Sequence, residues 1–291
     1  MSGGPLIVLQ EGFGRAAEKL VDTIRHVVDV AVSPNRTRAM AQAQADAEVI
    51  LAKGRAEVQD IQARADERVR KREARRQHNL ESITQKALEA LPPPEQLSEE
   101  PVNEDWTSRF FEECQDISDE QMQQIWARIL AGEVARPGSF APRTLSVARD
   151  LTKDDANLFA KVCEFVWFIP EVGFVPVIQE LDAPHLVTAG INFARLTHLS
   201  AIGLIEFGLM AYGLMQPIKQ ISPSYCDAVH HLKSDGGHER RFEFGRTIFT
   251  AVGAELHRIS GAQGNDEHQK AALQHWGREG WKEAGEATAA S

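Results

Sequence analysis

Cys226, His230, His231 and His238 are the side chains whose types best suit a metal ion. Cys226 and His230 are four residues apart, so on a helix they would share one face. Zinc sites usually add a second pair of ligands, but no second C-x-x-C and no carboxylate pair of recognisable spacing lies nearby. The pattern therefore favours an ordinary surface cluster, and we predict no metal and no other cofactor.

Motifs of catalysis do not occur in the chain. It has no G-x-x-x-x-G-K-S/T phosphate loop, no G-x-S-x-G nucleophile turn and no H-E-x-x-H pair. Arg128, Glu133 and Arg143 are interpreted as a buried arginine–glutamate pair that joins two helices, with ligand binding as the alternative. We predict no catalytic residues and favour a non-enzymatic protein, with an enzyme that has an unfamiliar site as the alternative.

One basic run, residues 64–76, offers a different chemistry. Its candidate phosphate contacts are Arg68, Arg70, Lys71, Arg72, Arg75 and Arg76. Asp66, Glu67 and Glu73 are interleaved, which is typical of a solvated helix face with ion pairs. The alternative is contact with the phosphates of nucleic acid or lipid, without base stacking because the run has no aromatic residue.

The composition is that of a globular protein. The chain has 291 residues, 43% of them apolar, and a formal net charge of -10, so any nucleic-acid role must rest on a local patch. Three cysteines cannot form a fully paired set, and the N-terminus lacks the features of a secretory signal. We expect a cytoplasmic protein.

Long helices dominate the predicted N-terminal part. Residues 1–34 hold an amphipathic helix that ends at Ser33-Pro34, which we interpret as docked on the protein itself or on another copy. Membrane-surface binding through residues 6–32 is the alternative. Residues 35–91 lack proline and predict a long helix or coiled coil with a thin apolar seam that includes Ile61, Ala65 and Val69.

A proline-rich acidic linker over residues 92–103 separates this rod from a helical core over 104–170. Helix N-caps are predicted at Asn103, at Ser118 and at Thr152, the last with Asp155 three residues on. The apolar stripes of these helices predict a buried core.

Residues 171–260 predict a winged-helix-like end. Pro176 restricts a β-prone stretch to a sheet edge or a strand end, and residues 242–248 alternate as in a strand. A recognition helix would offer DNA five polar side chains: Asn192, Arg195, Thr197, His198 and Ser200. Residues 261–291 predict a polar tail, largely mobile, in which Trp276 and Trp281 could dock a short helix.

Several stretches together carry a family resemblance. Residues 100–159, which begin EPVNEDWTSRFFEEC and continue through DEQMQQIWARILAGEVARPG, resemble the signature block of an uncharacterised bacterial family, domain of unknown function 2806. Its motif residues here are Trp106, Phe110, Trp126, Arg128, Leu130, Glu133, Pro137 and Arg143. The segment WARILA is also similar to one in abortive-infection alpha proteins, which implies a role in stopping phage growth.

These patterns predict a mainly α fold: a long N-terminal helix or coiled coil, then a helical domain with a small winged-helix-like α+β end. The expected function is that of a non-enzymatic, self-associating interaction protein, in line with the implied phage defence. A DNA-binding protein and a membrane-surface effector are the alternatives. We expect a homo-oligomer, with a protein partner, nucleic acid or a membrane surface as further candidates.

Overall fold

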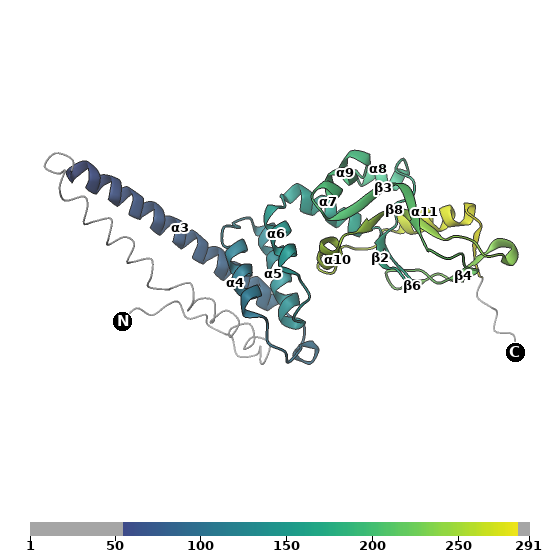
Figure 1. The fold of residues 1–291 in the computed structure, drawn as a ribbon, viewed down its shortest axis with the longest axis horizontal. Coiled ribbons are helices and arrows are strands. Elements are labelled where there is room, and N and C mark those ends of the chain that lie inside the picture. The colour runs from purple at the N-terminus through teal and green to yellow at the C-terminus, as the bar shows by residue number, and fades with distance from the viewer. Residues whose placement is uncertain (1–54, 285–291) are drawn as a thin grey trace. The chain divides into compact units, whose positions relative to one another are not determined.

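The structure is a computed structural model that describes residues 55–284. It divides into two compact units, one up to Arg149 and one from Asp150, and each is described by itself (Figure 1). The predicted amphipathic helix and residues 35–54 of the predicted rod lie outside the described residues.

The first unit is helical. Its elements are α3 (Arg55–Ala90), the 3-10 turn η2 (Pro94–Gln96), α4 (Glu104–Cys114), α5 (Glu120–Ala135) and α6 (Pro142–Asp150). Asn103 caps α4 as predicted, because its side chain accepts the Trp106 N–H at 3.0 Å. The cap of α5 is Asp119, one residue after the predicted Ser118. Ser118 is used elsewhere, since its hydroxyl accepts the Asn79 amide at 3.0 Å.

Aromatic packing forms the centre of the first unit. Trp106 stacks on Phe110, and Phe110 meets Trp126 edge to face, with 5.3 Å between ring centroids in both pairs. Trp106 Nε1 also donates to the Phe140 carbonyl at 2.7 Å, which ties α4 to the turn before α6. All three rings are buried.

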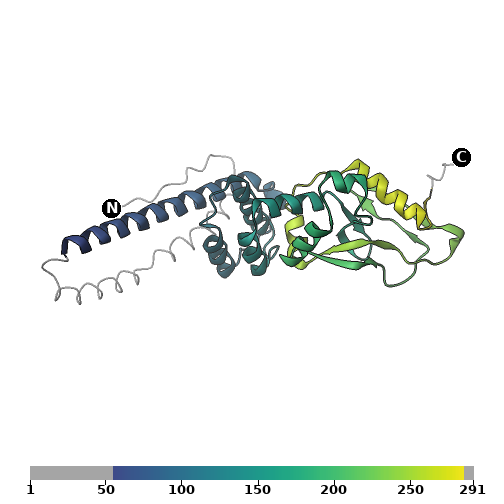
Figure 2. The same cartoon turned by 90° about the horizontal axis from the view of Figure 1, so that it is seen from above.

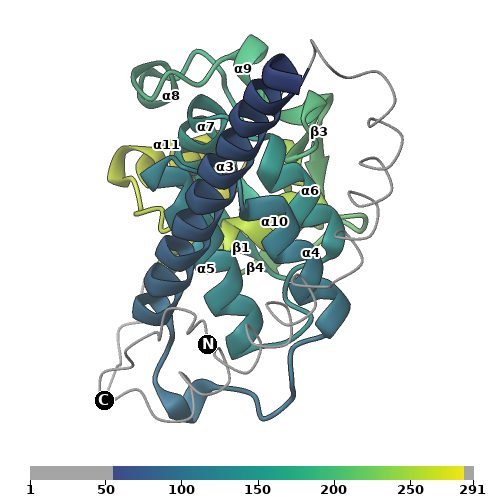
Figure 3. The ribbon, with the colours of Figure 1, turned by 90° about the vertical axis from the view of Figure 1, so that its left-hand side faces the viewer.

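The C-terminal part of α3 packs on α5 (Figure 3). Ile83 and Ala87 are fully buried there. Gln123 of α5 joins the two helices, because its Oε1 accepts from Ser82 Oγ at 2.8 Å and from Lys86 Nζ at 3.1 Å. Its Nε2 donates to the Ile117 carbonyl at 2.9 Å. Both ends of this buried amide are therefore satisfied, which is the condition for a polar group inside a core.

Glu133 closes the turn between α5 and α6. Its carboxylate is buried and accepts the backbone N–H of Gly138 at 2.7 Å and of Phe140 at 2.9 Å. Gly138 has a φ of 81°, a conformation that glycine adopts without strain. The turn thus has its own internal anion, which satisfies two backbone N–H groups that lie between the helices.

The second unit mixes helices and short strands. Its helices are α7 (Lys153–Cys163), α8 (Pro184–Thr188), α9 (Phe193–Ala201), α10 (Ala251–His257) and α11 (Asp266–Arg278), with a 3-10 turn η3 (Asp235–Gly237). Its strands are β1 (Val166–Ile169), β2 (Gly173–Pro176), β3 (Ile205–Gly213), β4 (Gln220–Ile221), β5 (Ser224–Tyr225), β6 (Ala228–Val229), β7 (Leu232–Ser234), β8 (Glu243–Phe249) and β9 (Trp281–Glu283). The capping box of Thr152 and Asp155 at α7 is present as predicted.

Within residues 55–284 the strands form three antiparallel sheets, ordered β2-β1-β5-β6, β3-β8 and β4-β7-β9. The predicted fold class is therefore wrong: the second unit is α+β, and it does not reduce to a winged-helix-like end. Strands of two or three residues are too short for an alternating pattern, which is why the sequence did not reveal them. Strand β2 does end at Pro176 on a sheet edge, as predicted.

The C-terminal residues belong to the core of this unit. Trp276 on α11 and Trp281 on β9 are buried with Trp167 and Phe242 in one apolar cluster, so these two indoles do dock a helix as expected. The prediction of a largely mobile polar tail is wrong over α11 and β9, which are built into the core of the unit. Trp276 Nε1 donates to the Glu243 carbonyl at 2.8 Å. In Figure 2, α11 is the long yellow helix beside the strands of this unit. The two indoles explain why this segment packs into the core. Each buries a large apolar area, and this gain outweighs the cost of placing the polar residues between them at the surface of the unit.

A buried imidazole connects this cluster to α8. Trp167 Nε1 donates to His268 Nε2 at 3.1 Å, so neutral His268 carries its proton on Nδ1, which lies 3.2 Å from His185 Nε2. Burial lowers the pKa of His268 to about 3, and burial also lowers the pKa of His185. Both rings are therefore neutral at neutral pH.

The first prediction concerns Glu133. Glu133→Ala leaves two N–H groups of the turn without an acceptor, so the first unit should lose about 1–3 kcal/mol of stability. Hydrogen exchange of the α5 amides in increasing urea measures this loss. Gln124→Ala, at an exposed position of the same helix, is the control and should change little. Equal effects of the two substitutions would contradict the assigned role of Glu133.

The second prediction concerns pH. The pKa of His268 is about 3 in the folded protein, whereas an unfolded histidine has a pKa of about 6.5. Between these two pH values the unfolded chain binds a proton at this residue and the folded chain does not. The second unit should therefore lose stability as pH falls through this window, by up to about 1.4 kcal/mol per pH unit for each such histidine. Exchange of the α11 amides, corrected for the intrinsic rate, reports it. His268→Gln should make the decline less steep, and an unchanged slope would refute the assignment.

Candidate functional site

The face of α3 that packs on α5 continues beyond α5 into solvent. Asn79, buried against the α4–α5 loop, lies about five helical turns after Ile61 and on the same face. Ile61 and Val69 are 55% and 42% exposed on this face, and Ala65 between them is half-buried. Figure 1 shows α3 extending past α4 and α5. The first half of α3 therefore presents an apolar stripe, Ile61, Ala65 and Val69, which we call the α3 stripe.

The basic run lies on the same exposed half of α3, and its charges are largely paired. Arg75 and Arg76 both bind Asp116, at 3.0 and 2.8 Å. The hydrogen bond from Arg76 lowers the pKa of Asp116 below its usual range, although slight burial opposes this. These two arginines hold the loop before α5 against α3, where the covered part of the helix begins.

Two more members of the run form local ion pairs, Lys71 with Glu67 at 2.7 Å and Arg72 with Glu73 at 3.1 Å. Arg68 and Arg70 are exposed. Four of the six predicted phosphate contacts thus have carboxylate partners. The arrangement favours the solvated, ion-paired helix face over a phosphate site.

The family-motif residues build the first unit. Trp106, Phe110, Trp126 and Leu130 are core side chains, and Pro137 is half-buried just after α5. Of the predicted buried arginine–glutamate pair only Glu133 is buried, because Arg128 and Arg143 have exposed side chains. The Glu133 carboxylate accepts backbone N–H groups of the turn after α5. The prediction of a buried arginine–glutamate pair between two helices is therefore wrong.

The predicted DNA contacts on α9 are partly used within the protein. The Asn192 side chain accepts the Arg195 N–H at 3.0 Å as the cap of α9. His198 Nε2 lies 2.5 Å from Asp155 Oδ1 of α7. These contacts engage the side chains of Asn192 and His198 within the protein, and DNA binding by α9 stays a prediction.

The residues of the predicted cysteine and histidine cluster do not converge on one point, and each makes its own contacts. His230 bonds Glu283 at 2.7 Å and Gln269 at 2.9 Å, and Cys226 is an exposed residue with a φ of 50°. Across residues 55–284, no group of three or more histidine, cysteine or acidic side chains is placed to hold a metal ion.

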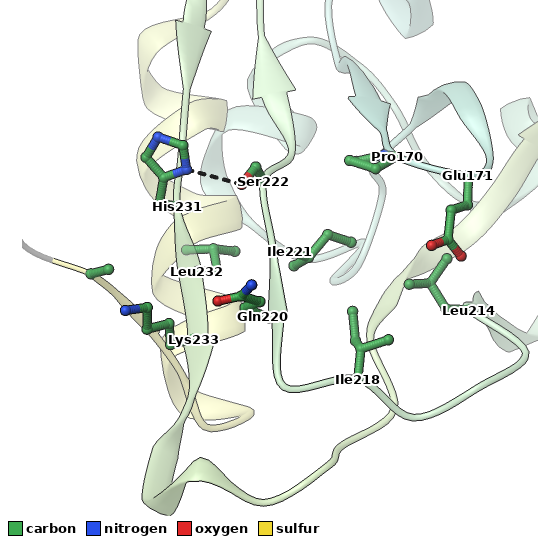
Figure 4. A pocket seen from close by; sticks show the side chains of 11 residues that line it. Pro170, Glu171, Leu214, Ile218, Gln220, Ile221, Ser222, His231, Leu232 and Lys233 are labelled. Carbon is green, nitrogen blue, oxygen red and sulfur yellow. Dashed lines mark hydrogen bonds between the residues drawn. The ribbon is translucent and has the colours of Figure 1, made fainter.

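His231 instead lies at the rim of a hollow of about 610 Å³ in the second unit (Figure 4). The lining residues are Pro170, Glu171, Leu214, Ile218, Gln220, Ile221, Ser222, His231, Leu232, Lys233 and Ala284. Apolar side chains make up much of the wall, with a few polar groups around it, which is the usual composition of a ligand site. We call this the β4 hollow.

Ser222 and His231 form the one side-chain hydrogen bond drawn in Figure 4, with Ser222 Oγ 2.9 Å from His231 Nδ1. Both side chains are exposed. The bond fixes the imidazole at the rim by joining the residue after β4 to the residue before β7. A nucleophile–base pair also needs a group that orients the base, and in the described part of the chain no side chain bonds His231 Nε2.

Sequence reasoning missed the β4 hollow, although it had singled out His231. The wall comes from segments between residues 170 and 284 that meet only in the folded unit. Strand β4 has two residues and β7 has three, so no periodic pattern marked them. The clustering of Gln220, Ser222 and His231 with apolar neighbours offered a weak signal at most.

The membrane-surface prediction rests on residues 6–32, which the structure does not describe. None of the helices between residues 55 and 284 combines the length and apolar character that a bilayer crossing requires.

Comparison with known proteins supports the family resemblance. No curated protein and no solved structure matched the chain. The likeness to abortive-infection alpha proteins is not shown by these comparisons. Residues 63–273 match the family described as "Protein of unknown function (DUF2806)", a span that runs from the exposed half of α3 into α11. The chain therefore belongs to the DUF2806 family.

Proposed function

We propose that this protein is an interaction protein that self-associates through the exposed half of α3. The observation that carries the proposal is the α3 stripe, which continues the face that α5 covers further along the helix. A second copy of α3 would offer the same narrow stripe in return, as a two-fold interface requires.

Helix physics supports a partner for this segment. Among residues 55–284, neither α4 nor α5 covers Ile61 and Val69, and a helix segment without such cover is only marginally stable in water. Covering Ile61 and Val69 removes apolar area from water, and each such side chain contributes on the order of 1 kcal/mol when only half of it is newly buried. Small residues such as Ala65 on the stripe allow the two helix backbones to approach closely.

Charge on the flanks of the stripe is compatible with helix pairing. The run over residues 64–76 carries both signs, with Lys71–Glu67 and Arg72–Glu73 already paired within one helix. A second copy can exchange these pairs for intermolecular ones at little cost, since exposed ion pairs contribute only about 0–1 kcal/mol. The charges on the flanks are therefore compatible with helix pairing but contribute little to it.

The third prediction tests this role by sedimentation of the full-length chain from low to high micromolar concentration. The wild-type chain should associate as its concentration rises. Ile61→Asp combined with Val69→Asp should shift the chain to monomer, because two carboxylates would be buried in the apolar contact.

The matched control places two aspartates on the opposite face, Ala63→Asp with Ala74→Asp, at exposed positions of the same helix. It adds the same charge and should leave association nearly unchanged. A wild-type chain that stays monomeric at high micromolar concentration would end the proposal. Equal association of the stripe variant and wild type would also end it.

Phage defence, implied by the resemblance to abortive-infection alpha proteins, stays a prediction. Survival of phage-challenged bacteria that express wild-type protein or the stripe variant tests it together with self-association. Membrane-surface binding through residues 6–32 also stays a prediction, and flotation with liposomes addresses it.

A further inference from the structure

Helix α5 limits how a second copy can lie on the α3 stripe. The stripe and α5 occupy the same face of α3, and the cover by α5 begins near Asn79, which bonds Ser118 just before that helix. Arg75 and Arg76 bind Asp116 at the edge of this cover. A helix that follows the stripe toward the C-terminus of α3 therefore meets the α4–α5 loop at about Arg75.

A parallel pair of α3 helices conflicts with this cover. In a parallel pair in the same register, each residue lies opposite its own copy, so the two helices continue side by side beyond Arg75. From Asn79 onward, the face that the partner helix would need is occupied by α5, whose packing on α3 buries Ile83 and Ala87. Parallel pairing would therefore displace part of the core of the first unit.

Two α3 helices that run in opposite directions avoid α5. With a two-fold axis at Ala65, residue 75 of one copy lies opposite residue 55 of the other. The paired segment is then residues 55–75 in both copies, and it ends where the contacts with Asp116 begin. This segment does not enter the face that α5 covers.

The α3 stripe is symmetric about Ala65. Ile61 precedes it by four residues and Val69 follows it by four. In the antiparallel pair, Ile61 of each copy packs against Val69 of the other, and both side chains are exposed in the single chain. The two Ala65 methyl groups meet at the axis, where small side chains let the helix axes approach closely. The same stripe thus supplies both sides of the contact.

The charge of α3 changes sign along the paired segment. Residues 55–67 hold two arginines and four acidic residues, a net charge of -2, and residues 68–74 hold three arginines, one lysine and one glutamate, a net charge of +3. An antiparallel pair brings the acidic part of each copy beside the basic part of the other, whereas a parallel pair brings like charges together. Exposed charges add little strength, but they select the orientation of paired helices.

We propose that a second copy binds the α3 stripe in the antiparallel orientation, with a two-fold axis at Ala65. This inference rests on the proposed self-association and specifies its geometry. Ile61 of each copy contacts Val69 of the other. The α5 helices of the two copies lie at opposite ends of the paired segment.

Disulfide cross-linking of full-length chains tests the orientation. All chains carry Cys226→Ser, because Cys226 is exposed whereas Cys114 and Cys163 are buried. Chains with Ile61→Cys are mixed with an equal amount of tagged chains with Val69→Cys and are then oxidised. In the antiparallel pair the mixed product should exceed each product of two like chains by about tenfold. Like positions would lie about 12 Å apart along the helices, beyond the reach of a disulfide.

The control mixture combines Ala63→Cys with Ala74→Cys, two exposed positions off the stripe, and gives the background. An excess of the products of like chains on the stripe would indicate a parallel pair and overturn the proposal. Oligomers whose mixed product stays at the background would also overturn it, because the contact would then lie elsewhere. A chain that sediments as a monomer would end both this inference and the proposed self-association, so sedimentation distinguishes the two failures.

The fourth prediction uses the charges. Arg68→Glu with Arg70→Glu lowers the net charge of residues 68–74 from +3 to -1, so the antiparallel pair loses its attraction and association should weaken by about tenfold at low salt. In a parallel pair the same change would remove a contact between basic parts and strengthen association. Arg143→Glu with Arg195→Glu, at exposed positions on α6 and α9, changes the net charge equally and is the control in sedimentation. Association that the α3 variant leaves unchanged or strengthens would refute the antiparallel orientation.

Discussion

The packing of α5 on α3 is the interaction on which the first unit depends. Because α5 is much shorter than α3, it covers only part of the α3 face. Helix α3 has 36 residues and α5 has 16, so at 1.5 Å per residue they are about 54 and 24 Å long. One face of α3 is therefore buried along its C-terminal part, and the α5 cover ends at the pairs of Arg75 and Arg76 with Asp116. The α3 stripe is the remainder of that face.

In the second unit, the short strands are held together more by side-chain packing than by backbone hydrogen bonds between strands. Trp167, Trp276 and Trp281 come from a strand, a helix and a second strand, and they meet in one cluster. Neutral His268 satisfies the indole of Trp167 within it. Because these large groups set the positions of β7 and β9, β4 can remain a two-residue outer strand beside a hollow. The outer edge beside β4 is covered in part, because Ile218 exchanges two backbone hydrogen bonds with Arg240.

The family motif and the proposed contact surface have different roles. Trp106, Phe110 and Trp126 form the aromatic centre of the first unit, and Glu133 satisfies the turn that follows α5. The residues most specific to the DUF2806 resemblance thus account for how the unit folds. The α3 stripe and the β4 hollow lie outside this motif block.

Local signals in the sequence determined the helices and their ends. Asn103 and Thr152 each cap a helix with a side-chain oxygen, and the end of α3 at Ala90 follows from the prolines after it. These signals act over three or four residues and can be read directly. Tertiary structure alone decided the sheets, the exposure of Arg128 and the β4 hollow. Each depends on residues far apart in the chain, and two-residue strands have no pattern of their own to predict where they pair.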